Sequence, residues 1–153
     1  MLETPTIVQT TDQLTAVIRL TIPHSSMRQE MGPAITEVSQ VVKAQGIGPA
    51  GPWLSHYLSI SPDQFDVEVA VPVLAPVVAT GRVQPARLPA ARAARATFHG
   101  DYAGLGAAWA EFRAWVEANG QVPGVDCWEV YRVGPERSGN SEDWRTDLYQ
   151  PLR

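Results

Sequence analysis

The residues best suited to chemistry in this sequence lie in a short run typical of a β-strand, Trp128-Glu129-Val130-Tyr131. Side chains two positions apart on a strand share a face, so Glu129 lies beside Tyr131 and Trp128 lies beside Val130. We expect the larger apolar pair to pack against helices. Glu129 and Tyr131 then point to the opposite, open face of the sheet.

An earlier run repeats this pattern, with Trp53, Ser55 and Tyr57 at alternate positions and with Leu54 and His56 on the other face. If the two runs meet, three aromatic rings surround one carboxylate. Each ring can contribute about 0.5–2 kcal/mol to a cation over its face, and a desolvated carboxylate needs a countercharge. This arrangement favours an apolar, planar cation as ligand. The pattern leaves an alternative open, in which the carboxylate is solvated and the nearby phenol only shields the sheet.

Two stretches of the chain, residues 31–73 and 105–152, carry the same signals in the same order. Each has apolar residues at helical spacing, then a glycine that ends the pattern, then two strand-like segments of which the second reaches a proline. Repeated signals in one order indicate a duplication. The matched pairs are Gly46 with Gly120, Pro49 with Pro123 and Tyr57 with Tyr131, each 74 positions apart (120 − 46, 123 − 49 and 131 − 57).

Strand-like sequence also precedes each helical pattern, at residues 14–22 in the first copy and at residues 77–83 and 91–98 in the second. The unit is therefore strand–helix–strand–strand, used twice. We predict an α+β fold in one domain over residues 1–153, with a first repeat of about 5–75 and a second of about 76–153. A small sheet with one helix cannot bury both faces alone, so we expect a joint antiparallel sheet with pseudo-twofold symmetry, helices on one face, and a ligand cleft between the repeats.

Composition excludes several classes of protein. The chain has 153 residues, 44% of them hydrophobic, with 12 basic and 16 acidic side chains and a formal net charge of −4. An acidic surface opposes phosphate contacts, so we expect no direct DNA binding. The single cysteine, Cys127, cannot form an internal disulfide, and no apolar run reaches the roughly 18 residues of a membrane span. From the order of residues 1–5 we expect no secretory signal. These features predict a cytoplasmic protein.

Cofactor and metal motifs are weak. Residues 46–51 match G-x-G-x-x-G, but they follow a helix and precede a strand, which is the reverse of the dinucleotide fingerprint. The three histidines and Cys127 are not spaced as metal ligands. We therefore expect neither a cofactor nor a metal, and we interpret His99, before Gly100, as a capping or loop histidine.

Four segments carry motifs that recur in one known family. Residues 98–105 read F-H-G-D-Y-A-G-L, residues 129–131 read E-V-Y, residues 146–152 read T-D-L-Y-Q-P-L, and residues 51–73 contain G-P…Y…D-x-E-x-x-x-P-V. In this order they resemble the GyrI-like domain, the effector-binding module of AraC-type and MerR-type multidrug-responsive regulators. The resemblance covers nearly the whole chain, although Asp101 stands where proline is common.

The resemblance implies a duplicated fold with a ligand cleft, in which Glu129 engages lipophilic cations and aromatic residues flank it. Tyr102, in the H-G-x-Y segment, and Trp144, in the long loop of the last hairpin, join the expected ligand contacts. Whether Trp144 covers the cleft as a lid or packs elsewhere stays open. The regulators carry a separate helical DNA-binding domain, for which we expect no room in this chain.

Three functions remain. The first is a stand-alone protein that senses or sequesters amphipathic, cationic aromatic compounds, with Glu129 as countercharge and with Trp53, Tyr57 and Tyr131 stacking on the ligand. The second, implied by some stand-alone family members, is a hydrolase of strained, cyclopropane-bearing genotoxins, with Glu129 as general base and Tyr131 or Tyr57 donating to the oxyanion. The third is a gyrase-inhibitor-like module that binds a protein partner through an exposed surface.

Overall fold

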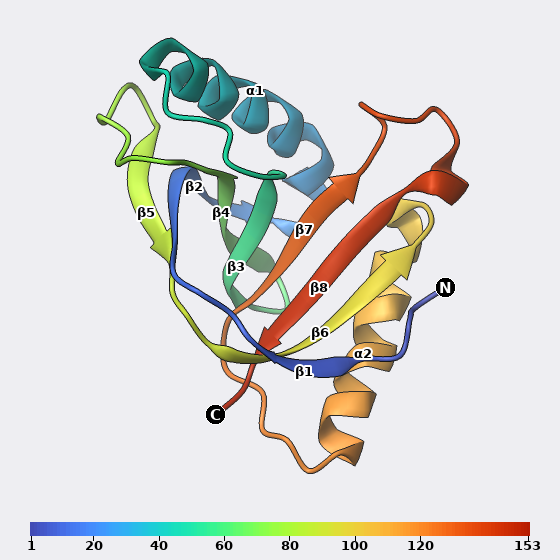
Figure 1. Cartoon of the computed structure of the whole chain (residues 1–153). Helices are drawn as coiled ribbons and strands as arrows, with labels where there is room; N and C mark the ends of the chain where they lie inside the picture. The colour runs from blue at the N-terminus through green and yellow to red at the C-terminus, as the bar shows by residue number, and fades with distance from the viewer. The chain divides into compact units, whose positions relative to one another are not determined.

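The computed structural model describes residues 1–153, which form eight β-strands and two α-helices. Figure 1 shows the chain, which divides into two compact units by its contacts. The first unit is Thr11–Ala90, and the second unit combines Met1–Thr10 with Ala91–Arg153. Each unit has a four-stranded antiparallel sheet and one α-helix, which confirms the predicted α+β class and the duplicated strand–helix–strand–strand module.

The sheet of the first unit has the strand order β3-β4-β2-β5. The long strand β2 pairs with β4 over nine residue pairs, and it pairs with β5 on its other edge. Three successive residues of β2, Ala16, Val17 and Ile18, are buried. The strands are β2 (Gln13–Pro23), β3 (Leu54–Ile60), β4 (Gln64–Pro72) and β5 (Gln84–Leu88).

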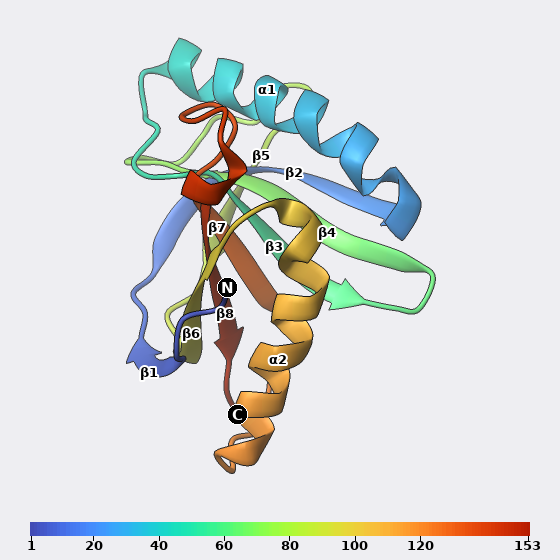
Figure 2. The ribbon, with the colours of Figure 1, turned by 90° about the vertical axis from the view of Figure 1, so that its right-hand side faces the viewer.

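Helix α1 (Met27–Gln45) covers one face of this sheet and contacts β2 and β4 (Figure 2). It begins four residues before Met31, where the first of the two repeated stretches starts. Its buried residues, Ala34, Val38 and Val42, recur every fourth position, as a single buried stripe requires. The helix ends at Gly46, which takes a left-handed φ of 67°. Only glycine adopts this conformation without strain, which explains why the helical pattern stops there.

The sheet of the second unit has the strand order β1-β6-β8-β7. The central strand β8 pairs with β6 and β7, and its residue Leu148 is fully buried. The N-terminal strand β1 pairs with β6 and was not predicted from the sequence. The strands are β1 (Thr6–Gln9), β6 (Arg92–His99), β7 (Cys127–Val133) and β8 (Arg145–Pro151).

Helix α2 (Leu105–Ala118) packs against β6 and β8 of the same unit (Figures 1 and 2). Its buried residues are Ala108, Phe112 and Val116, again one in every four. Two alanines of β6, Ala94 and Ala96, face it. Their small side chains leave room for the Phe112 ring to reach the sheet, where it packs with Leu148. Neither helix of the protein is long and apolar enough to cross a membrane.

One predicted strand was wrong. Residues 77–83 form no strand, and only an isolated bridge joins Thr80 to Val83. The apolar residues Val77 and Val83 are nevertheless buried, at 4% and 0% exposure, so this segment fills the core as a loop. Gly81, with a φ of 57°, turns the chain, and the strand β5 begins directly after it, at Gln84.

Candidate functional site

Glu129 is a buried carboxylate in the middle of β7, with only 5% of its surface exposed. One of its oxygens, Oε1, accepts a hydrogen bond from the indole Nε1 of Trp109 at 2.7 Å. The other, Oε2, accepts from the hydroxyl of Tyr131 at 2.6 Å. Because Trp109 belongs to α2, the carboxylate lies on the helix-covered face of the second unit's sheet.

This placement corrects the expected orientation of β7. Glu129 and Tyr131 do share a face, as alternation predicts, but it is the covered face and not the open one. Trp128 occupies the opposite face, where its ring stacks on Tyr149 with centroids 5.3 Å apart and an angle of 15°. The prediction assumed that the larger apolar residues face the helix. Here Leu148, the register partner of Glu129, supplies the apolar contact with α2 instead.

Burial raises the pKa of Glu129, while the hydrogen bonds from Tyr131 and Trp109 act in the opposite direction. Both donors are uncharged, so they stabilise the carboxylate without neutralising it. The alternative in which Glu129 faces solvent is therefore wrong. The arrangement is a desolvated acid whose ionised form a bound cation would stabilise further.

An aromatic row extends from this carboxylate through the second unit. The Tyr131 ring meets the edge of Tyr102, with centroids 5.6 Å apart at 72°. The Tyr102 ring lies in turn against Trp144, 5.0 Å away at 37°. We call Trp109, Glu129, Tyr131, Tyr102 and Trp144 the acid–aromatic row. Trp109 comes from α2, Glu129 and Tyr131 come from β7, and Tyr102 comes from the 3₁₀ turn before α2. Trp144 lies in the loop before β8.

Local hydrogen bonds hold the outer part of the row in place. The carboxylate of Asp101 caps the short 3₁₀ turn that carries Tyr102, because it accepts from the Ala103 amide at 2.8 Å. The Trp144 indole donates to the Ser138 carbonyl at 2.9 Å, and the Trp144 carbonyl accepts from the Gly100 amide at 3.1 Å. These contacts hold Trp144 against Tyr102. A role for Trp144 as a lid stays a prediction.

Trp109 was not predicted as a site residue. The sequence placed it in the apolar stripe of the second helix, and its ring does contact Phe112 at 5.5 Å. The signal that could have found it is chemical. A half-buried indole N–H needs an acceptor, and Glu129 is the acid that a neighbouring covered strand supplies.

The predicted residues of the first unit also face a helix. Ser55 is fully buried on β3 and contacts the Sδ atom of Met31 on α1 at 3.9 Å. Tyr57 shares that face and packs edge-on against Phe65, 5.2 Å away at 62°. The expected open-face location is therefore wrong for this pair as well. Trp53 lies just before β3 and is half-buried. A role in ligand binding for Trp53, Ser55 and Tyr57 stays a prediction.

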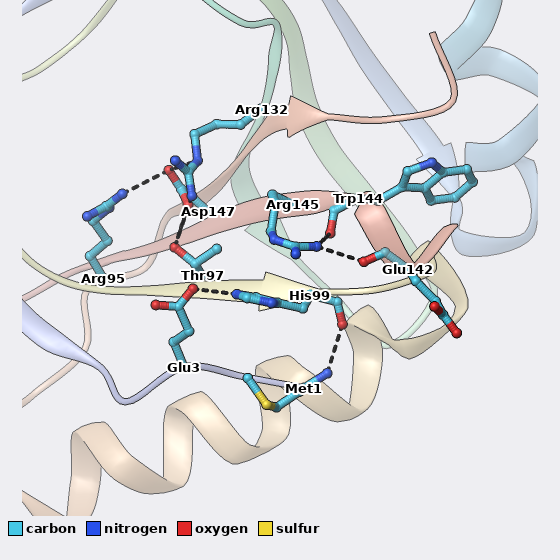
Figure 3. Close-up of polar contacts among 10 residues, drawn as sticks. All are labelled: Met1, Glu3, Arg95, Thr97, His99, Arg132, Glu142, Trp144, Arg145 and Asp147. Atoms are coloured by element: carbon cyan, nitrogen blue, oxygen red, sulfur yellow. Dashed lines mark hydrogen bonds and ion pairs between the residues drawn. The ribbon is translucent and has the colours of Figure 1, made fainter. Parts of the chain in front are cut away.

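The open face of the second unit carries a separate polar network (Figure 3). Asp147, almost fully buried, accepts hydrogen bonds from Thr97 at 2.7 Å and from Arg95 at 3.1 Å, and it forms an ion pair with Arg132 at 2.9 Å. His99 ends β6 and contacts the carboxylate of Glu3 (Figure 3). Asp147 and Glu3 thus each contact a basic side chain. Glu129, by contrast, accepts only from the neutral side chains of Trp109 and Tyr131.

A family model for the GyrI-like small molecule binding domain matches residues 3–153. The chain therefore belongs to the GyrI-like family, as its motifs predict. A search of curated protein sequences found no match.

Solved structures share the fold. The EcmrR C-terminal domain superposes with a TM-score of 0.84 at 21% identity, over 98% of this chain and 97% of that one. EcmrR in a cryo-EM complex with DNA superposes with a TM-score of 0.85 at 22% identity, over 98% of this chain. This chain spans only 57% of the length of that EcmrR chain. SAV2435 bound to tetraphenylphosphonium superposes with a TM-score of 0.63 at 12% identity, over 99% of this chain and 94% of that one. A hydrolase from Listeria innocua superposes with a TM-score of 0.68 at 14% identity, over 97% of this chain and 91% of that one.

Proposed function

We propose that this chain binds amphipathic aromatic cations at the acid–aromatic row and so senses or sequesters them. The observation that carries the proposal is the state of Glu129, which is buried at 5% exposure yet held by two neutral donors. A cationic ligand would supply the missing countercharge, and the rings of Tyr131, Tyr102 and Trp144 would supply apolar and cation–π contacts. The family and the tetraphenylphosphonium complex of a structural neighbour support this chemistry.

The acidic composition of the chain, with a net charge of −4, supports the expectation that it does not bind DNA itself. In this proposal the ligand is the primary partner, and any effect on transcription or efflux passes through another protein. A location in the cytoplasm remains part of the proposal.

The test is a tryptophan-fluorescence titration with tetraphenylphosphonium. The substitution Glu129→Gln removes the charge and keeps the shape, so the Kd should rise about 5- to 150-fold, equivalent to about 1–3 kcal/mol. Glu111→Gln, which removes an exposed acid from α2, is the matched control and should leave the Kd unchanged. Triphenylphosphine oxide, a neutral compound of similar shape, should bind wild type and E129Q equally weakly. Equal affinity of wild type and E129Q for the cation would refute the proposal.

A second candidate, hydrolysis of strained electrophilic genotoxins, is favoured by one observation. Burial raises the pKa of Glu129, as a general base working near neutral pH requires. Tyr131, which already donates to this carboxylate, would steady the base or donate to a developing oxyanion. In that case E129Q would keep substrate binding and lose turnover, which separates this function from cation binding. If neither cations nor reactive cyclopropanes are bound, the gyrase-inhibitor-like interaction module becomes the better hypothesis.

A further inference from the structure

Tyr102 ends in a hydroxyl group that is buried and has no hydrogen-bond partner in the protein. Buried hydroxyls are almost always paired in folded proteins, and an unpaired one costs about 1–3 kcal/mol. A second such group, the hydroxyl of Thr146, lies on β8 opposite Tyr131, where Thr146 is its register partner. Both unpaired hydroxyls therefore belong to residues next to Tyr131, whose own hydroxyl donates to Glu129.

The Tyr102 side chain is held so that its hydroxyl stays buried. Its ring is wedged between Tyr131 and Trp144, and Asp101 caps the turn that carries it. The hydroxyl also lies close to the main chain of Gly134, because a Cβ atom at that position would stand 2.5 Å from the hydroxyl oxygen. A side chain at 134 would have displaced the tyrosine, so the glycine permits this placement.

The Tyr102 hydroxyl is a neutral hydrogen-bond donor at physiological pH. Burial, and next the nearby carboxylate of Glu136, raise its pKa to about 12. The carboxylate of Glu129 acts in the same direction. The proton therefore stays on the phenol, and the group that would satisfy it is an acceptor, such as an ether, carbonyl or hydroxyl oxygen.

We propose that the ligands of this chain are aromatic cations that also carry a hydrogen-bond acceptor, which accepts from the Tyr102 hydroxyl while the cation pairs with Glu129. This inference rests on the proposed function and refines its ligand class. Tyr131 connects the two groups, because its ring contacts Tyr102 and its hydroxyl donates to Glu129. A ligand that covers the Tyr131 ring can therefore meet the charge on one side and the donor on the other.

The test compares matched phosphonium ions by fluorescence titration. Tetraphenylphosphonium carries no acceptor, and its derivatives with one methoxy or one ethyl group, at each of the three ring positions, have nearly equal size. Wild type should bind the best methoxy isomer about 3- to 10-fold more tightly than the matched ethyl isomer. Tyr102→Phe should abolish this preference, whereas Tyr149→Phe, on the opposite face of the sheet, should retain it.

Other outcomes distinguish a failure of the acceptor from a failure of cation binding itself. If the phosphonium ions bind wild type but show no methoxy preference, or if Y102F keeps that preference, this inference is wrong and cation binding stands. If none of them binds wild type, both fail. Urea unfolding adds a readout without ligand, because Y102F removes an unpaired hydroxyl and should leave the protein at least as stable as wild type. A loss of stability in Y102F would show that the hydroxyl is already paired and would overturn the inference.

Discussion

The buried carboxylate of Glu129 should make the protein's stability depend on pH in a distinctive direction. Its folded-state pKa is raised, chiefly by burial, so the folded protein holds the proton to higher pH than the unfolded chain does. Stability from this group is then fully present below the unfolded pKa and is lost as the pH rises through the folded pKa. Each unit of difference between the two pKa values is worth about 1.4 kcal/mol.

Comparison with Glu129→Gln isolates this effect, since all other titrating groups are common to both proteins. At acid pH the protonated acid and the side-chain amide of E129Q each keep one acceptor oxygen for the Trp109 indole and one donor toward the Tyr131 hydroxyl oxygen, so the substitution costs little there. E129Q and wild type should therefore be about equally stable at acid pH, and E129Q should gain on wild type as the pH rises toward neutrality.

Urea unfolding from pH 4 to pH 8 measures the difference in the free energy of unfolding between wild type and E129Q. Thermal unfolding is a second readout, in which 1 kcal/mol corresponds to a shift in Tm of about 2–4 °C for a chain of this length. Glu111→Gln, at an exposed position on α2, should run parallel to wild type. A constant difference between wild type and E129Q across the whole range would refute the reasoning, because it would mean that Glu129 titrates alike in the folded and unfolded states.

Two further substitutions test the geometry of the row. Trp109→Phe keeps an aromatic ring but removes the donor to Glu129 Oε1, so the pKa of Glu129 should rise further and the affinity for tetraphenylphosphonium at neutral pH should fall about 3- to 10-fold in a fluorescence titration. Gly134→Ala would place a Cβ 2.5 Å from the Tyr102 hydroxyl and should destabilise the protein by about 1–3 kcal/mol in urea. Gly106→Ala, where nothing lies within 4 Å, should instead be neutral or stabilising, and equal effects of the two alanines would contradict the described packing.

Much of the architecture was predictable because it depends on local signals. The helical patterns end at Gly46 and Gly120 because these residues take left-handed φ values of 67° and 69°. The strands β4 and β8 end at Pro72 and Pro151, the prolines that close the second strand-like segment of each repeat. Strands that depend on distant partners were harder. Residues 6–9 and 84–88 are short and lack clear alternation, and they become strands because β6 and β2 offer edges to pair with.

The candidate site was predicted in composition but not in orientation. Alternation along β7 correctly grouped Glu129 with Tyr131, but period-two spacing does not say which face the helix covers. The decision falls to residues elsewhere, since Leu148 from β8 fills the core beneath α2 and leaves the Trp128 ring to stack on Tyr149. The hydrogen bond from Trp109 to Glu129 could not be predicted either, because it joins α2 and β7 across the face that the helix covers.

Cation binding at the row depends on one electrostatic relation, in which the ligand supplies the charge that Glu129 lacks. Binding of a cation to a carboxylate with a raised pKa must lower that pKa and expel a proton where the group is partly protonated. Calorimetric titrations with tetraphenylphosphonium, in buffers of different ionisation enthalpy at mildly acid pH, count the protons released. We predict net release from wild type and none from E129Q. Equal proton counts for the two proteins would contradict this relation.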